Sequence, residues 1–113
     1  KFLDSGCAAF GREERLQKLS DTPSAILRRQ LRVTPYPHED VRWILENSGE
    51  EMVLFSSDFP HVEGGRNPLK RFNDSLAGVD ERTKRAFYRD NFIDLMGAGL
   101  DPALHDLPQL AAA

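Results

Sequence analysis

The sequence predicts an α/β fold in which short parallel strands, buried on both faces, alternate with helices. The run Met52–Phe55 provides the main evidence, because its four apolar residues lack the two-residue alternation of a half-exposed strand. Segments also alternate along the chain in the order strand, helix, short helix, strand, helix, strand, helix, helix. Such an order is typical of right-handed βα units on a parallel sheet.

The N-terminal third is predicted to hold a strand stub and two helices. Phe2 and Leu3 are the only apolar residues before a turn at residues 4–6. Residues 8–19 place apolar side chains at loose helical spacing, with charged residues on the other face. Thr22 and Pro23 then provide an N-cap and a first-turn proline for a second, shorter helix.

Later boundaries are marked by prolines, caps and glycines. Residues 31–36 contain β-branched and aromatic residues that suit a strand, which Pro35 and Pro37 end. Each of the remaining helices is predicted to start at an acidic residue or an Asn-Pro pair and to end at a glycine. These helices span residues 39–49, 67–78 and 80–97.

The length sets how much of a parallel fold is present. The 113 residues allow one domain with a modest core. Three strands buried on both faces are too few to close a barrel, and a complete (β/α)8 barrel takes about 250 residues. Because the chain also opens on what looks like the end of a strand, we expect residues 1–97 to form about three C-terminal βα units of a TIM barrel. Residues 98–113 are expected to be a weakly ordered tail.

Composition argues against nucleic-acid and membrane partners. The formal charge is −3 and the pI near 5.6, and the one basic cluster, residues 28–32, is interpreted as a solvated helix end rather than a phosphate site. No apolar run approaches the roughly 20 residues that cross a bilayer. The single cysteine, Cys7, fits a reducing compartment and is interpreted as packing material rather than a nucleophile. We expect a cytoplasmic protein.

The principal candidate site follows the Met52–Phe55 strand. Asp58 lies at the predicted carboxyl end of this strand, where ligand sites of α/β folds gather. It is a candidate metal ligand or general base, with a structural cap as the alternative. Ser56 and Ser57 are expected to orient it by hydrogen bonds, and His61 is its natural partner on one ion or one water.

Weaker candidates are expected on the same rim. His38 follows the Val33 strand and Asp4 follows the strand stub, so both would face the edge that carries Asp58. Arg66, after two glycines, is a candidate to bind a substrate carboxylate. Helix-start polarity is the alternative for His38, and simple solvent exposure is the alternative for Arg66. His105 in the tail is assigned no role.

Familiar catalytic motifs are missing from the sequence. It contains no His-x-His, Cys-x-x-Cys, Gly-x-Gly-x-x-Gly or Gly-x-Ser-x-Gly. A catalytic zinc takes three protein ligands and a water, whereas Asp58 and His61 supply at most two at one strand end. The chain alone is therefore short of metal ligands.

Residues 55–61, Phe-Ser-Ser-Asp-Phe-Pro-His, resemble the "SDYPH"-type segment at the eighth strand of amidohydrolase-related TIM-barrel proteins. This family includes metal-dependent hydrolases and non-oxidative decarboxylases. Residues 2–6 look like its sixth-strand "FLESG", residues 28–35 like its seventh strand, and residues 91–97 like its closing "N-x-x-x-L-x-G" helix. The resemblance covers Lys1 to about Gly97, the C-terminal three-eighths of the barrel.

The resemblance implies a role for each matched residue. Asp58 matches the aspartate that binds the metal and helps to activate water, and His61 matches a histidine that lines the pocket. Asp4 stands where better-known members carry a metal-binding histidine, which is a departure from the pattern. The family's first-strand His-x-His and fifth-strand histidine would lie upstream. The complete enzyme would use a divalent metal, zinc or manganese.

Two functions remain open from the sequence. The first is the C-terminal part of an amidohydrolase-related enzyme that hydrolyses or decarboxylates a small carboxylate or cyclic substrate and is inactive alone. Its partners would be the small-molecule substrate and either a second copy or the missing N-terminal part of the barrel. The second is a non-catalytic α/β module that pairs with another chain through an exposed sheet edge.

Overall fold

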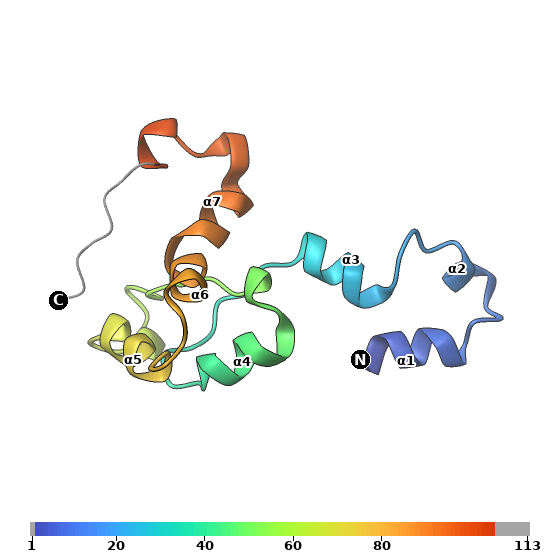
Figure 1. Cartoon of the computed structure of the whole chain (residues 1–113), viewed down its shortest axis with the longest axis horizontal. Helices are drawn as coiled ribbons and strands as arrows, with labels where there is room; N and C mark the ends of the chain where they lie inside the picture. The colour runs from blue at the N-terminus through green and yellow to red at the C-terminus, as the bar shows by residue number, and fades with distance from the viewer. Residues whose placement is uncertain (1, 106–113) are drawn as a thin grey trace. The chain divides into compact units, whose positions relative to one another are not determined.

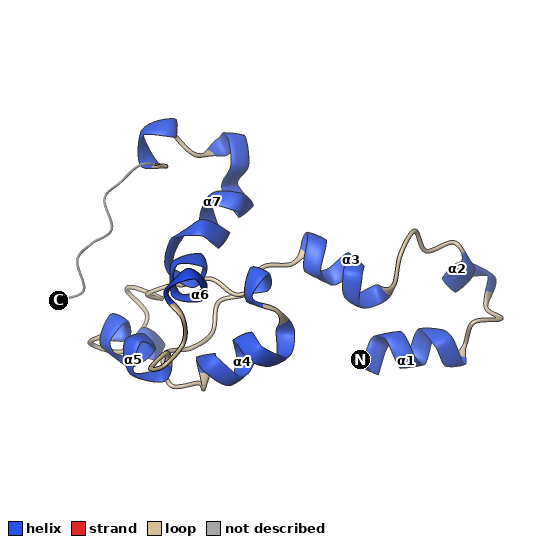
Figure 2. Ribbon diagram, in the orientation of Figure 1, coloured by secondary structure: helices blue, strands red, loops and turns tan. Residues whose placement is uncertain are grey.

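The computed structural model describes residues 2–105, and these residues are mainly helical (Figures 1 and 2). Within them there is no sheet, so the prediction of an α/β fold and of a partial TIM barrel was wrong. One isolated parallel bridge, between Val33 and Val53, is the strand pairing that this part of the chain retains. The chain divides into two compact units, Lys1–Arg32 and Val33–Ala113, which are described separately.

The bridge cannot lengthen into a ladder for two local reasons. Val33 donates its N–H to the carbonyl oxygen of Met52 (2.8 Å) and accepts the N–H of Leu54 (2.9 Å). On one side, Pro35 and Pro37 lack the N–H groups that further rungs need. On the other side, Met52 already ends a 3-10 turn, η1 (Glu50–Met52). The two segments that were predicted as strands therefore pair with each other only at this bridge.

The first unit contains α1 (Phe2–Ala9), α2 (Glu14–Gln17) and α3 (Pro23–Gln30). The strand stub predicted at Phe2 and Leu3 is wrong, because both residues begin α1. The predicted start of α3 is confirmed: the side chain of Thr22 accepts the N–H of Ala25 (3.4 Å), and Pro23 lies in the first turn.

The second unit is built from α4, α5 and a continuous helical stretch, connected by short 3-10 turns. The caps predicted at Asn67 and Asp80 are confirmed, because each accepts a backbone N–H three residues ahead, at 3.1 and 3.0 Å. Asp40, predicted only as an acidic residue of the first helical turn, caps α4 in the same way (3.0 Å). The elements are α4 (Val41–Ser48), η2 (Val62–Gly64), α5 (Pro68–Ser75), α6 (Glu81–Arg85), the π-helical turn η3 (Ala86–Asp90), α7 (Asn91–Met96), η4 (Gly97–Gly99) and η5 (Pro102–Leu104).

The core of the second unit is aromatic and aliphatic. The largest fully buried side chains come from α4, the bridge, α5 and η3: Phe72, Phe87, Leu76, Val41 and Val53. The rings of Phe72 and Phe87 meet edge to face with centroids 5.4 Å apart, and Phe55 adds a third ring 5.5 Å from Phe72. Edge-to-face pairs add to the stabilisation that burial provides.

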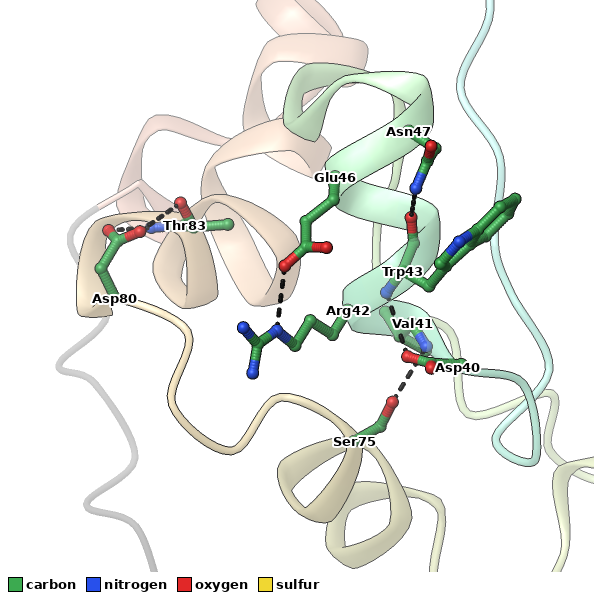
Figure 3. A network of polar contacts seen from close by, with 9 residues as sticks. All are labelled: Asp40, Val41, Arg42, Trp43, Glu46, Asn47, Ser75, Asp80 and Thr83. Atoms are coloured by element: carbon green, nitrogen blue, oxygen red, sulfur yellow. Dashed lines mark hydrogen bonds and ion pairs between the residues drawn. The ribbon is translucent and has the colours of Figure 1, made fainter.

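Close contacts also fix the start of α4 (Figure 3). Asp40 accepts the N–H of Trp43, and Ser75 at the end of α5 accepts the N–H of Val41 through its hydroxyl oxygen (2.9 Å). Two of the N–H groups that every helix start leaves without an intrahelical partner are thereby satisfied. The second of these bonds joins α4 to α5.

The helical stretch 81–96 anchors the segment that precedes the candidate site. In the wide π turn, the N–H of Asn91 bonds to the carbonyl oxygen of Ala86, which leaves the Phe87 carbonyl free of its usual helical donor. Phe87 instead accepts the N–H of Phe55 (2.9 Å). The side-chain amide of Asn91 donates to the carbonyl oxygens of Glu50 (2.6 Å) and Val53 (2.7 Å). Residues 50–55 are therefore held by the helix rather than by a sheet.

A cluster at the start of α6 gives the second unit a dependence on pH. The Thr83 hydroxyl lies 2.7 Å from a Glu50 oxygen and 2.8 Å from an Asp80 oxygen, and Arg82 pairs with Glu50 (2.6 Å). The Thr83 hydrogen bond, followed by that of Arg82, lowers the pKa of Glu50 from its ordinary 4.5. The Thr83 N–H lowers the pKa of Asp80 from 3.8. A lowered carboxylate pKa stabilises the fold above the unfolded-state value, and this contribution is lost as the pH falls through the folded-state value.

We therefore expect the free energy of unfolding of the second unit to fall as the pH drops below about 4.5, and Thr83→Val to reduce that fall. At pH 7 the substitution should cost on the order of 1 kcal/mol, because the Glu50 carboxylate is partly screened by solvent. Urea titrations followed by Trp43 fluorescence at pH 7 and pH 3 measure both effects. The exposed Thr34→Val is the matched control. An equal effect of Thr83→Val at both pH values would contradict this account.

Candidate functional site

The Asp58 and His61 side chains come together in the loop after the bridge. Nδ1 of His61 lies 3.0 Å from Oδ1 of Asp58, a hydrogen bond in which a protonated Nδ1 donates to the carboxylate. The His61 side chain is 71% exposed and that of Asp58 is 33% exposed. The pair predicted from the sequence is thus in contact, and it lies open to solvent.

Local backbone contacts, rather than contacts to the carboxylate, fix this loop. The hydroxyl oxygens of Ser56 and Ser57 accept the N–H groups of Asp58 (3.2 Å) and Phe59 (3.3 Å). His61 donates its backbone N–H to the Asp58 carbonyl oxygen (2.8 Å), which closes the turn that carries both side chains. Asp58 has φ +54°, a left-handed conformation that Asp tolerates better than most residues. The two serines therefore position Asp58 through the main chain.

Gly64 packs against the Asp58 turn, although its place in a Glu-Gly-Gly-Arg segment predicts only a flexible loop. A Cβ built on Gly64 would lie 2.2 Å from the Ser57 carbonyl oxygen and 3.2 Å from Cβ of Asp58. No side chain fits there, so only glycine lets η2 return against the Asp58 turn. A Gly-Gly pair is read as a loop signal, and this close approach has no local signature in the sequence.

Comparisons of the chain with protein-family models, with curated proteins and with solved structures give no match. The likeness to amidohydrolase-related proteins therefore remains a resemblance of short segments. Within residues 2–105, no helix is both long enough and apolar enough to cross a membrane.

The other predicted site residues lie in separate local environments. His38 is exposed and stacks on Tyr36, with ring centroids 5.5 Å apart. Arg66 is exposed in the bend after η2. Asp4 belongs to the first unit, where its carboxylate accepts the N–H of Ser24 (2.9 Å); this bond lowers its pKa. Since the described chain has no sheet, the shared rim expected for Asp4, His38 and Asp58 does not exist there. The substrate-binding roles of Asp4, His38 and Arg66 stay predictions.

The residues at hand do not complete a catalytic zinc site. Asp58 and His61 are two donors, and across residues 2–105 no group of three or more His, Cys, Asp or Glu side chains is placed to hold a metal ion. A catalytic zinc takes three protein ligands. The pair therefore fits a metal only if further donors come from outside this part of the chain. A carboxylate–imidazole pair is chemically able to transfer protons without a metal.

A histidine bonded through Nδ1 to a carboxylate has a defined chemical state. When neutral, its one proton sits on Nδ1 and its lone pair on Nε2. Because the His61 ring is mostly exposed, small molecules in solution can reach it. This arrangement is that of a general base oriented by a third group.

Proposed function

We propose that Asp58 and His61 are the proton-transfer pair of an enzyme that hydrolyses or decarboxylates a small carboxylate or cyclic substrate. The observation that supports this most is the 3.0 Å hydrogen bond between His61 Nδ1 and Asp58 Oδ1 on an exposed turn. His61 would accept or deliver the proton at Nε2, and Asp58 would hold the ring and its tautomer. The resemblance of residues 55–61 to the amidohydrolase-related segment supports the choice of reaction class.

The proposal keeps three expectations from the sequence. A divalent metal, zinc or manganese, would assist the reaction only with donors beyond residues 2–105, so no step here depends on it. The substrate is a small molecule, and neither nucleic acid nor a membrane is a proposed partner. A cytoplasmic location agrees with the single cysteine.

The alternative of an interaction module has less support. It required an exposed sheet edge for pairing with another chain, and the described part of the molecule contains an isolated bridge instead of a sheet. We therefore do not propose pairing through a sheet edge.

An activated ester tests the proposed proton-transfer pair without knowledge of the substrate. With p-nitrophenyl acetate, we expect the chain to release p-nitrophenol faster than buffer does. His61→Gln should remove most of this excess rate. Asp58→Asn should lower it by about tenfold, below the 10²–10⁴-fold typical of a complete general acid–base site because this pair is exposed.

The chain provides its own controls, since it contains three histidines. His38→Gln and His105→Gln should leave the excess rate unchanged within about twofold. Circular dichroism checks that every variant keeps its helices. A loss in His38→Gln equal to that in His61→Gln, or an excess rate that survives His61→Gln, would refute the assignment.

A further inference from the structure

A hollow in the second unit is lined by residues outside the Asp58 loop. It has a volume of about 310 Å³, at the lower end of the range of small-molecule sites. Its apolar walls come from the bridge segment, η3, α7, the link after η4, and η5. They consist of three aromatic and three aliphatic side chains: Phe55, Tyr88, Phe92, Ile93, Leu100 and Leu104.

The aromatic walls are held in place by contacts behind them. The Tyr88 hydroxyl donates to Oδ1 of Asn73 (2.7 Å), and burial raises the Tyr88 pKa to about 12. Its ring lies 5.5 Å from that of Phe55 and 4.9 Å from that of Phe87. The Tyr88 hydroxyl is therefore neutral and already bonded, so the ring offers the hollow an aromatic surface.

Among the lining residues that fall within positions 2–105, Arg89 is the one that carries a charge. Its guanidinium lies 3.4 Å from an Asp90 oxygen, whereas Arg85 approaches the same carboxylate more closely, at 3.0 Å. The guanidinium groups of Arg85 and Arg89 thus share the Asp90 carboxylate. A cation beside apolar walls favours a ligand with an apolar body and one negative group.

We propose that this hollow binds a small apolar monocarboxylate, with its hydrocarbon body against the aromatic and aliphatic walls and its carboxylate on Arg89. The inference is independent of the proposed function, because neither Asp58 nor His61 lines the hollow. It assigns a second small-molecule site to the second unit.

Phenylacetate and 2-phenylethanol are matched probes, since they differ mainly in the carboxylate. Each is titrated into the 15N-labelled full chain at constant ionic strength, and amide shifts are recorded. We expect phenylacetate to shift residues 88–104 with a dissociation constant on the order of 1–10 mM, as expected for so small a ligand. 2-Phenylethanol should bind the same residues at least threefold more weakly.

Two arginine variants separate the charge from the general surroundings. Arg89→Gln should weaken phenylacetate binding by about three- to tenfold and leave 2-phenylethanol unchanged. Arg42→Gln, which removes a guanidinium that pairs with Glu46 outside the hollow, should keep binding within about twofold. Equal binding of both probes, or an Arg89→Gln variant that binds phenylacetate normally, would overturn the assignment. A dimer by light scattering with no response to phenylacetate would overturn it too, because a second copy would then cover the hollow.

Discussion

Replacing Asn91 by alanine is expected to lower the free energy of unfolding of the second unit by about 2–4 kcal/mol. Asn91 is 8% exposed as a residue, and its side-chain amide donates to two backbone carbonyl oxygens, those of Glu50 and Val53. Its removal leaves both carbonyls without this donor, and an unsatisfied buried acceptor costs about 1–3 kcal/mol. Urea unfolding followed by fluorescence measures the loss, because the single tryptophan, Trp43, lies in this unit.

A second asparagine provides the matched control for Asn91. Asn47 also donates its side-chain amide to a backbone carbonyl, that of Trp43 (2.8 Å), but on the exposed face of α4 (Figure 3). Asn47→Ala should therefore cost less than about 0.5 kcal/mol. Asn91→Asp should be at least as damaging as Asn91→Ala, because it turns an oxygen toward two carbonyl oxygens. Equal small losses at positions 47 and 91 would show that the Asn91 hydrogen bonds contribute little to the stability of the second unit.

Replacing Phe72 by alanine should produce the other large loss, about 3–5 kcal/mol. Phe72 has no exposed surface and contacts the rings of both Phe55 and Phe87. Truncation leaves a cavity between α5 and η3 and removes two aromatic contacts. For a unit of this size, such a loss lowers the melting temperature by tens of degrees or abolishes cooperative unfolding.

The control for Phe72→Ala is the same substitution at a phenylalanine that lies outside the core. Phe59 is 87% exposed, so Phe59→Ala should change the melting temperature by only a few degrees. Differential scanning calorimetry of both variants measures the difference. A Phe72→Ala variant that melts close to the unchanged chain would contradict the assignment of the core.

Several helix boundaries could be predicted from the sequence because they depend on local chemistry, although the helix predicted over residues 8–19 is replaced by α1 and α2. Asp40, Asn67 and Asp80 cap their helices, as their residue types and neighbours indicate. Gly49 and Gly97 follow α4 and α7 with positive φ values of 110° and 48°. Each of these helix boundaries depends on residues that lie within one helical turn of each other.

Whether a sheet forms could not be predicted in the same way, because strand pairing depends on residues far apart in the sequence. The Met52–Phe55 run is as apolar as a buried strand, yet Met52 and Val53 are covered by a helix-built core. A short apolar run does not by itself separate a central strand from a buried extended segment. Asn91 and the Phe87 carbonyl provide the hydrogen bonds that a sheet would have supplied.

The candidate site was predictable in part. The pairing of Asp58 with His61 followed from their spacing, and the structure brings them into hydrogen-bond contact. The grouping of Asp4 and His38 with them followed only from the expected parallel sheet, and the described chain has no sheet that would bring them there. The role of Gly64 depends on a backbone approach seven residues away, which no local pattern reports.

The tautomer of His61 tests the central claim most directly. Long-range 1H–15N correlation spectra of the imidazole ring show which nitrogen carries the proton when the ring is neutral. We expect the proton on Nδ1 in the unchanged chain, and a shift toward the Nε2 form that free histidine prefers in Asp58→Ala. A neutral His61 protonated mainly on Nε2 in the unchanged chain would contradict the Asp58–His61 pair and the function proposed from it.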